Sequence, residues 1–255
     1  MDKLRETSGA QSLRRALQLL RLIAEHQEQG LRLTQVMAAT GLERSTVHRL
    51  LSCLVEEHFA ERNPDGKAYR LGVDSMQLGF AAMRRIPLVE QCRPLMQRLA
   101  RMSGDTVFLV MRQGDHSLCL LREEGPFPVK VFTTDAGGRR LLGLGAGGLA
   151  LMAQLADDEV ERIYERNAAE YAQADFTRER LLQAVRQTRQ RGWSDIVDTL
   201  TVGVSGVGAT FHASPATLAA ISFGAITPRL PPERKQELAQ LLLSQQASTA
   251  SPPSS

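Results

Sequence analysis

The segment from Arg32 to Gly72 is the part of the sequence that most constrains the fold. Apolar residues recur there at i, i+3, i+4 and i+7 and form one stripe along a helix predicted from Ser45 to Glu57. A shorter helix, Gln35 to Ala39, precedes it, and the hydroxyl of Thr34 can cap that helix. Gly41 supplies the turn between the two helices, because a residue without a side-chain carbon adopts a positive φ at little cost. The stripe consists of Val47, Leu50, Leu51 and Leu54.

A short hairpin follows the second helix. Residues 59–62 and 68–71 alternate apolar and polar side chains around the segment 63–67, Asn-Pro-Asp-Gly-Lys, whose residues are typical of a turn. Two helices joined by a glycine turn and followed by a hairpin predict a winged helix-turn-helix, a fold that binds double-stranded DNA. An earlier helix, 12–27, is predicted to pack under this unit. Its apolar face consists of Leu13, Leu17, Leu20 and Ala24 and is broadened by Leu19 and Ile23.

Polar and basic residues on the free face of this unit are candidates for DNA contacts. Guanidinium groups can bind guanine edges in the major groove, and hydroxyls near a helix N-terminus can contact bases or phosphates. Basic residues at the hairpin tip and on its return strand are candidate phosphate contacts. The alternative is a small helical subdomain with a solvated polar face, which we disfavour because the turn, the stripe and the basic hairpin agree. The predicted DNA contacts are Thr34, Arg44, Ser45, Thr46, His48, Arg49, Lys67 and Arg70.

The same residues resemble the DNA-binding domain of the IclR family of bacterial transcriptional regulators. The resemblance rests on the run Arg44-Ser45-Thr46-Val47-His48-Arg49-Leu50-Leu51 and on the closing Tyr69-Arg70-Leu71-Gly72. It continues through the C-terminal part and so covers nearly the whole chain. It implies a ligand-responsive, sequence-specific regulator, typically of a catabolic operon, with a double-stranded DNA operator and a small-molecule effector as partners. A homodimer and a homotetramer are both compatible with this resemblance, as are repression and activation.

Beyond residue 72 the pattern predicts a second, larger domain. Residues 73–86 have helical periodicity up to Pro87 and resemble the family's linker helix. From Asp105 the period becomes that of strands, with helices between them, which predicts an α/β (α+β) module with an antiparallel sheet. The resemblance implies that this module is the family's GAF-like effector-binding domain. The predicted domains are a winged helix-turn-helix at 1–72, the linker helix at 73–86, the effector-binding domain at 87–245 and a disordered tail at 246–255. Strands are predicted at 106–112, 117–123, 129–133, 193–199, 206–211 and 218–225, and helices at 89–102, 145–155, 157–166, 177–192 and 232–243.

Glycines are concentrated between Gly137 and Gly148, ahead of an apolar helix. Such a segment lets backbone amides approach a ligand, and a helix N-terminus attracts anions. In the IclR family the corresponding loop forms one wall of a pocket for a small metabolite, often a carboxylate, although members usually have proline where Leu141 stands. Close packing of the helix on the sheet is an alternative role for these glycines, and the two roles are compatible. The residues that match the family's pocket are Gly145, Ala146 and Gly147.

The resemblance places the opposite wall of that pocket after Trp193. Asp198 matches the family's acidic residue, Ser205 lies in its Gly-Val-Ser turn, and Ser222 matches a polar position on the next strand. The two serines could donate hydrogen bonds to a ligand oxygen, while Asp198 could accept one or hold the loop. For Ser222, an inward serine without a ligand contact is an equal alternative. Many relatives carry a cysteine near residues 207–209 that this chain lacks.

Composition supports this interpretation and could not replace it. The formal net charge is +3, and residues 1–85 account for all of it, with 13 Lys and Arg against 10 Asp and Glu. Cys53, Cys92 and Cys119 are widely spaced and odd in number, which predicts reduced thiols in the cytoplasm and neither disulfides nor a zinc site. Cys53 is expected to have a packing role, with redox sensing as the alternative. We expect no metal and no cofactor. We also expect no membrane partner, since no stretch approaches the ~20 apolar residues of a membrane span.

Two other functions compete with transcriptional regulation. One is an enzyme, or a non-catalytic metabolite-binding protein, built on the C-terminal domain with DNA binding secondary. Catalysis needs a nucleophile or base held against a partner, and the spacing identifies no such arrangement, so we expect no enzymatic activity. The other is an architectural DNA-binding protein, which would not need a ligand pocket. The mechanism we expect is a population shift, in which effector binding changes how effector domains pair and the linker helix transmits the change to the DNA-binding units.

Overall fold

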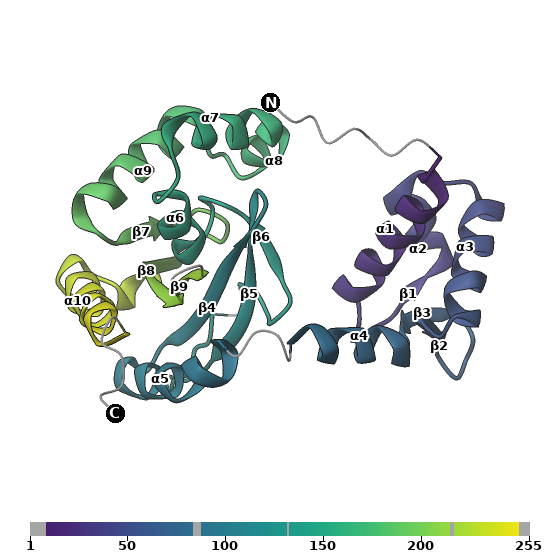
Figure 1. Ribbon diagram of the computed structural model, residues 1–255, viewed down its shortest axis with the longest axis horizontal. Helices are drawn as coiled ribbons and strands as arrows, with labels where there is room; N and C mark the ends of the chain where they lie inside the picture. Colours follow the sequence, from purple (N-terminus) through teal and green to yellow (C-terminus); the bar gives the residue numbers. More distant parts are fainter. Residues whose placement is uncertain (1–8, 84–87, 132, 215–216, 250–255) are drawn as a thin grey trace. The chain divides into compact units, whose positions relative to one another are not determined.

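The computed structural model describes residues 9–83, 88–131, 133–214 and 217–249. They form two compact units, one within Met1–Pro87 and the other within Leu88–Ser255 (Figure 1). None of the described helices combines the length and the apolar character that a bilayer-spanning helix needs.

The N-terminal unit is the predicted winged helix-turn-helix. Its short antiparallel sheet has the order β1-β3-β2, in which Leu31 pairs with Tyr69 and Ala60 pairs with Leu71. The turn between the two helices is made by Gly41, whose φ is 66° as predicted for that position. The elements are α1 (Gln11–Glu25), β1 (Leu31–Arg32), α2 (Leu33–Thr40), α3 (Arg44–Glu56), β2 (Ala60–Arg62), β3 (Ala68–Leu71) and α4 (Val73–Met83).

The core of this unit collects apolar side chains from α1, α2, α3 and the sheet. Leu19 and Ile23 of α1 are fully buried and belong to the same core cluster as Leu51 of α3. The predicted apolar face of α1 was right for Leu19 and Ile23 and wrong for Leu13 and Leu17, which are 61% and 41% exposed. Leucines occur on two overlapping faces of this helix, so the period alone does not choose between them.

The predicted linker helix begins at Val73 and is described as far as Met83; residues 84–86 of the prediction lie outside the described part of the chain. Its start packs against the segment that follows α3. A Cβ at Gly72 would lie 2.2 Å from the His58 carbonyl oxygen, and the Ser75 hydroxyl donates to the Phe59 carbonyl at 2.7 Å. Several apolar side chains of α4 are exposed, namely Val73, Met76, Leu78 and Phe80.

The C-terminal unit is an α+β domain with a six-stranded sheet of order β6-β5-β4-β9-β8-β7. Every neighbouring pair of strands is antiparallel, as predicted. The strands are β4 (Thr106–Gln113), β5 (His116–Glu123), β6 (Arg139–Leu141), β7 (Ser194–Val197), β8 (Val204–Ser214) and β9 (Thr217–Ile226). The helices are α5 (Leu88–Ser103), α6 (Ala146–Met152), α7 (Asp157–Arg166), α8 (Ala168–Gln173), α9 (Arg178–Arg191), a 3-10 turn (Thr227–Arg229) and α10 (Pro232–Thr249).

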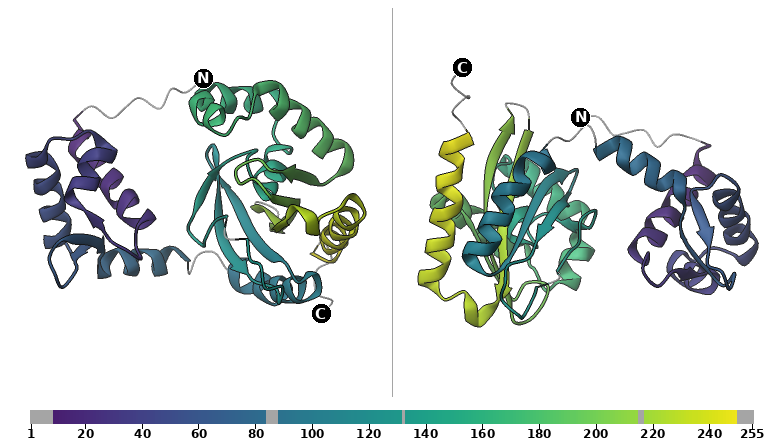
Figure 2. Two further views of the ribbon diagram at one scale, coloured as in Figure 1. Left: turned by 180° about the vertical axis from the view of Figure 1, so that it is seen from behind. Right: turned by 90° about the horizontal axis from the view of Figure 1, so that it is seen from below.

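Helices cover both faces of this sheet (Figure 2). On one face α5 packs against β4 and β5, and α10 packs against β8. On the other face α6 crosses β4, β8 and β9, and α9 lies beside it. The core on that second face is closed by Tyr171 of α8, which is fully buried and donates a 2.7 Å hydrogen bond to the Leu142 carbonyl. This packing holds the glycine-rich segment firmly against the sheet.

Three predictions for the C-terminal unit need correction. The predicted strand 129–133 is wrong at its described positions, since the preceding loop bonds to the turn at Gly104 and Asp105 through the amides of Phe127 and Gly125. The strand that extends the sheet is β6, inside the glycine-rich segment. Helix α5 begins at Leu88, one residue before the predicted start at 89, and ends at Ser103, with Pro94 inside it.

The predicted disordered tail was also wrong in part. Residues 246–249 form the end of α10, because Gln and Ala are good helix formers and the helix is already anchored on the sheet. The remainder of the predicted tail, residues 250–255, lies outside the described residues.

Candidate DNA-binding surface and effector pocket

Helix α3 separates apolar from polar side chains along its length. Its buried residues are the four of the predicted stripe: Val47, Leu50, Leu51 and Leu54. The opposite face carries Arg44, Ser45, His48 and Arg49, all exposed, with Thr46 half-buried beside them. The structure thus brings five of the predicted DNA contacts together on one free helix face.

Thr34 does not cap α2, which corrects the prediction for its hydroxyl. The helix begins at Leu33, two residues before the predicted start at Gln35, so Thr34 lies inside its first turn with an exposed side chain. The orphan donor at the helix start is the Arg32 amide, which donates to Gln35 Oε1 at 2.8 Å. A role for Thr34 in DNA binding stays a prediction.

The two predicted phosphate contacts of the wing, Lys67 and Arg70, differ in exposure and in their hydrogen bonds. Lys67 is exposed at the tip, where its amide donates to Asp65 Oδ1 at 3.1 Å and shapes the turn. Arg70 is half-buried, and its Nη2 donates to the Glu28 carbonyl at 2.7 Å. Arg70 therefore ties the wing to the loop after α1, a structural role that sequence reasoning missed.

Cys53 is exposed on α3, which contradicts the expected packing role. It lies at the end of the turn that follows Arg49, on the flank between the buried stripe and the basic face. The buried stripe of α3 is therefore narrower than its apolar residues predict, because it does not include Cys53.

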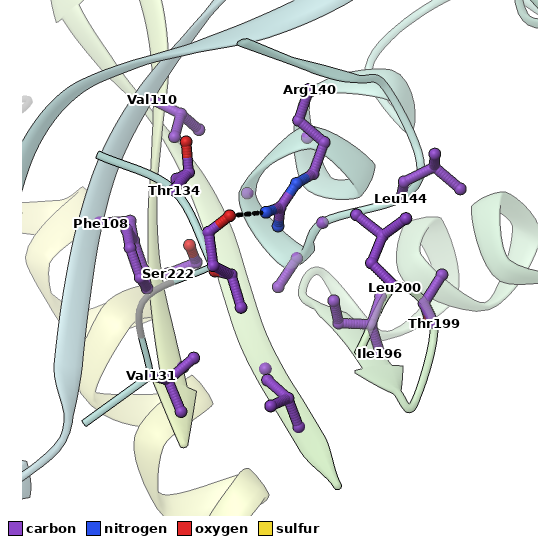
Figure 3. Close-up of a pocket in the computed structure, with 18 of the residues that line it drawn as sticks. Phe108, Val110, Val131, Thr134, Arg140, Leu144, Ile196, Thr199, Leu200 and Ser222 are labelled. Carbon is purple, nitrogen blue, oxygen red and sulfur yellow. Dashed lines mark hydrogen bonds between the residues drawn. The ribbon is translucent and has the colours of Figure 1, made fainter. Parts of the chain in front are cut away.

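The C-terminal unit contains a pocket between α6 and the sheet, with a cavity volume of about 60 Å³. Figure 3 shows two groups of side chains facing each other across it, with Phe108, Val110 and Val131 on one side and Leu144, Ile196 and Leu200 on the other. A mostly apolar lining with a few polar groups is typical of sites that bind small organic molecules.

Five of the six predicted effector-binding residues line this pocket: Gly145, Ala146, Gly147, Ser205 and Ser222. Ser222 is nearly buried on β9, and its hydroxyl has no hydrogen-bond partner among the described residues. The Ser205 hydroxyl is already engaged with Thr227 Oγ1 at 2.9 Å. The two serines are therefore not equivalent, since only Ser222 keeps its hydroxyl available.

Asp198 is the sixth predicted residue, and it does not line the pocket. Its carboxylate accepts from the Gly203 amide at 2.8 Å and from the Thr227 hydroxyl at 3.0 Å. Its φ of 49° lies in the left-handed region, which is uncommon for a residue other than glycine. Asp198 holds the loop between β7 and β8 closed, one of the two roles considered for it.

The glycines also serve close packing. A Cβ at Gly147 would lie 2.6 Å from Val110 Cγ2, and one at Gly208 would lie 2.8 Å from the Ala146 carbonyl carbon. Helix α6 has only seven residues, against the eleven predicted, so its dipole is weaker than expected. The pocket and the tight helix-sheet contact thus depend on the same residues.

Arg140 of β6 is a pocket residue that sequence reasoning missed. It lies opposite Ser117 of β5 and is half-buried, whereas its neighbour Arg139 is exposed. Burial lowers the pKa of Arg140 below the usual arginine value. The available signal was the alternation from Arg139 to Leu141, but glycines on both sides concealed the strand.

Cys119 lines the same pocket from β5 and is buried. Desolvation raises the pKa of its thiol to about 11, so the thiol stays protonated at neutral pH. A protonated thiol is a poor nucleophile, and the pocket lining among the described residues contains no histidine, aspartate or glutamate to activate it.

Comparison with known proteins gives consistent matches along the chain. The C-terminal domain of the bacterial transcriptional regulator IclR matches residues 80–251, and the IclR helix-turn-helix domain matches residues 12–64. The HTH-type transcriptional regulator BhcR of Paracoccus denitrificans is 30% identical over 237 residues, which cover 85% of this chain and 84% of BhcR.

Solved structures share the fold. The IclR family transcriptional regulator from Brucella abortus superimposes with a TM-score of 0.75 at 23% identity, covering 94% of this chain and 92% of that one. An IclR homolog from Microbacterium hydrocarbonoxydans, complexed with 4-hydroxybenzoate, has a TM-score of 0.68 at 18% identity, covering 93% of this chain and 99% of its own.

Proposed function

Because the chain belongs to the IclR family of bacterial transcriptional regulators, we propose that it controls a catabolic operon in response to a small organic acid. The observation that carries the proposal is α3, whose apolar residues are buried while Arg44, Ser45, His48 and Arg49 are exposed. An exposed basic helix after a glycine turn is suited to the major groove.

The residues of the DNA-binding surface divide into two roles. Arg44 and Arg49 bind base edges, because a guanidinium matches the paired acceptors of guanine. Ser45, Thr46 and His48 add shorter contacts along the same helix, and Thr34 contacts the backbone from α2. Lys67 binds phosphate from the wing, which positions the unit without reading sequence.

The effector binds in the pocket of the C-terminal unit. Its walls are apolar, and the hydroxyl of Ser222 is available to a ligand oxygen. Gly145, Ala146 and Gly147 bring the backbone of α6 close to the ligand, while Ser205 and Asp198 support the loop that forms the other wall. An aromatic acid is one candidate, since an IclR homolog of the same fold is complexed with 4-hydroxybenzoate.

The protein acts as a homodimer through its N-terminal units and as a homotetramer through its effector domains. Exposed apolar side chains on α1 and α4 support the first contact, namely Leu13, Leu17, Val73, Met76, Leu78 and Phe80. Two copies would place two recognition helices on half-sites one helical turn apart, so we expect a palindromic operator.

Effector binding works by a population shift. A ligand changes DNA binding only if its affinity differs between two arrangements of the oligomer. Pairing of effector domains sets the arrangement, and α4 connects each effector domain to its DNA-binding unit in the chain. The protein works in the cytoplasm, where its operator DNA is.

We propose that the pocket binds and does not catalyse. The one thiol in the lining, Cys119, has a pKa of about 11 and no base beside it among the described lining residues. Purified protein incubated with organic acids should return them unchanged, and turnover would favour the alternative of an enzyme with secondary DNA binding.

Selection of DNA from a random-sequence pool tests the main proposal. The full-length protein should enrich one palindromic sequence, and footprinting should protect that sequence alone. Uniform coating of the DNA would instead indicate an architectural protein. A candidate effector identified by a saturable thermal shift should then change the affinity for the selected sequence.

A further inference from the structure

Arg140 is the charged residue in the described lining of the pocket, and no carboxylate accompanies it. Other half-buried arginines of this unit have acidic partners. Arg229 lies 2.7 Å from Asp105, and Arg112 lies 2.8 Å from Glu159. The positive charge of Arg140 is therefore left without a counterion inside an apolar pocket.

The donors of Arg140 are largely free. A guanidinium has five N–H donors, and among the described residues the one acceptor is the Thr133 carbonyl, which receives a bond from Nη2 (Figure 3). Desolvation lowers the pKa of Arg140, and no nearby carboxylate raises it again. A partly desolvated cation with spare donors is a poor arrangement for stability and a good one for an anionic ligand.

The glycine at 145 makes room for this side chain. A Cβ at Gly145 would lie 3.2 Å from Arg140 Cδ and 3.3 Å from Nη1, so a larger residue there would require the Arg140 side chain to shift by a few tenths of an ångström. The absence of a side chain at Gly145 thus lets the Arg140 guanidinium lie against the start of α6. The remaining walls are mostly apolar, with Phe108 and Leu144 among the side chains that face the cavity, and their polar side chains are the hydroxyls of serines and threonines such as Ser222.

We propose that Arg140 binds the carboxylate of the effector and makes the pocket selective for organic monoacids with an apolar body. This inference rests on the proposed function of the pocket. The planar guanidinium can grip both carboxylate oxygens at once, and the apolar walls enclose the rest of the molecule. Neutral analogues leave the cation unpaired, and a second carboxylate would find no second cation in the described lining.

Matched pairs of acids and amides test this selectivity on the full-length protein. The probes are 4-hydroxybenzoate, phenylacetate and 4-methylpentanoate, each with its neutral amide, titrated by calorimetry. Wild type should bind at least one acid, and bind its amide roughly 10- to 100-fold more weakly, as expected for a lost charge-assisted pair. Equal affinity for an acid and its amide would overturn the inference, and so would the absence of binding by every acid.

Substitutions at two adjacent arginines separate Arg140 from general charge effects. Arg140→Gln should lose the preference for the acid, while Arg139→Gln, with the same change of charge at an exposed position, should keep it. Arg140→Lys serves if the glutamine variant does not fold, and it should bind acids more weakly than wild type because it lacks the planar fork. Acid binding unchanged in the Arg140 variants would overturn the inference.

The same samples distinguish this inference from the proposed function. Operator binding that responds to a neutral compound would leave the regulator intact and remove Arg140 from ligand recognition. Selective binding of acids without any sequence-specific DNA binding would overturn the proposed regulator function and leave the role of Arg140 in ligand recognition intact.

Discussion

The two units of this protein present their functional residues in opposite ways. In the N-terminal unit, most of the predicted DNA contacts lie on one helix and point outward. In the C-terminal unit, the pocket is lined from β4, β5, β6, α6, β7, β8, β9 and three loops, and the important groups point inward. A surface on one helix follows from local periodicity, whereas a pocket depends on the pairing of distant segments.

This difference predicts how substitutions will act. Removal of an outward side chain from α3 leaves no buried polar group without a hydrogen-bond partner. Such a substitution should therefore change DNA binding and leave folding intact. The pocket residues are also packing residues, so most changes there should alter stability and ligand affinity together.

The largest effect on binding is expected for Arg49→Ala. If Arg49 binds a base, the variant should lose about 1–3 kcal/mol of operator affinity and tolerate changes at one base pair. Arg186→Ala, an exposed arginine of the other unit, is the matched control and should bind like wild type. Fluorescence anisotropy with the selected operator and its single-base variants measures both quantities. Unchanged affinity in Arg49→Ala and in Arg44→Ala would remove the proposed docking of α3.

The next effect compares one chemical change in the two units. Gly147→Ala places a Cβ 2.6 Å from Val110 Cγ2, and overpacking of this kind costs about 1–3 kcal/mol of the free energy of unfolding. Gly79→Ala on α4 meets nothing within 4 Å and should gain about 0.5–1 kcal/mol, since alanine favours a helix.

Denaturant unfolding can follow the two units separately. Trp193 is the single tryptophan of the chain and belongs to the C-terminal unit, so its fluorescence reports on Gly147→Ala. Circular dichroism of the helices reports on Gly79→Ala. If both substitutions stabilise, the close approach of α6 to β4 is not a constraint and the pocket is more open than described here.

The sequence predicted the N-terminal unit almost element by element. The four residues of the stripe are the buried residues of α3, and Gly41 has the predicted positive φ. The errors were local. Leu13 and Leu17 were given to the buried face of α1, and Thr34 was given a capping role that the Arg32–Gln35 pair makes unnecessary.

The C-terminal unit was predicted less completely, for physical reasons. Its strand order joins β4 to β9, segments about 100 residues apart in the chain, and no local pattern encodes that pairing. Helix α8 is one and a half turns long and is held by the burial of Tyr171, so it has little periodicity of its own. Arg140 became visible as a ligand group only when β6 placed it beside the pocket.

Ser222→Ala should have a smaller effect on ligand binding. The Ser222 hydroxyl has no protein partner in the described part of the chain, so one neutral hydrogen bond to the ligand is worth about 0.5–1.5 kcal/mol. The free protein should unfold at nearly the same denaturant concentration as wild type. Ser194→Ala is the contrasting variant, because its buried hydroxyl bonds the Ala146 carbonyl at 2.6 Å and its loss should lower stability. Identical ligand affinity in Ser222→Ala would assign Ser222 to packing alone.

The smallest effects separate two basic residues that the sequence treats alike. Lys67 is exposed at the tip of the wing and makes its one described bond through the backbone, so Lys67→Ala should leave stability unchanged. If its ammonium binds a phosphate, the variant should weaken binding to all DNA sequences equally and reduce the slope of log affinity against log salt by about 1. Arg70→Ala removes the bond to the Glu28 carbonyl and should cost about 0.5–1.5 kcal/mol of folding stability. A salt titration of operator binding, run beside a denaturant melt for each variant, distinguishes the two roles. A change in stability without a change in salt slope for Arg70→Ala would make the wing's return strand an anchor of the fold and leave Lys67 as the phosphate contact.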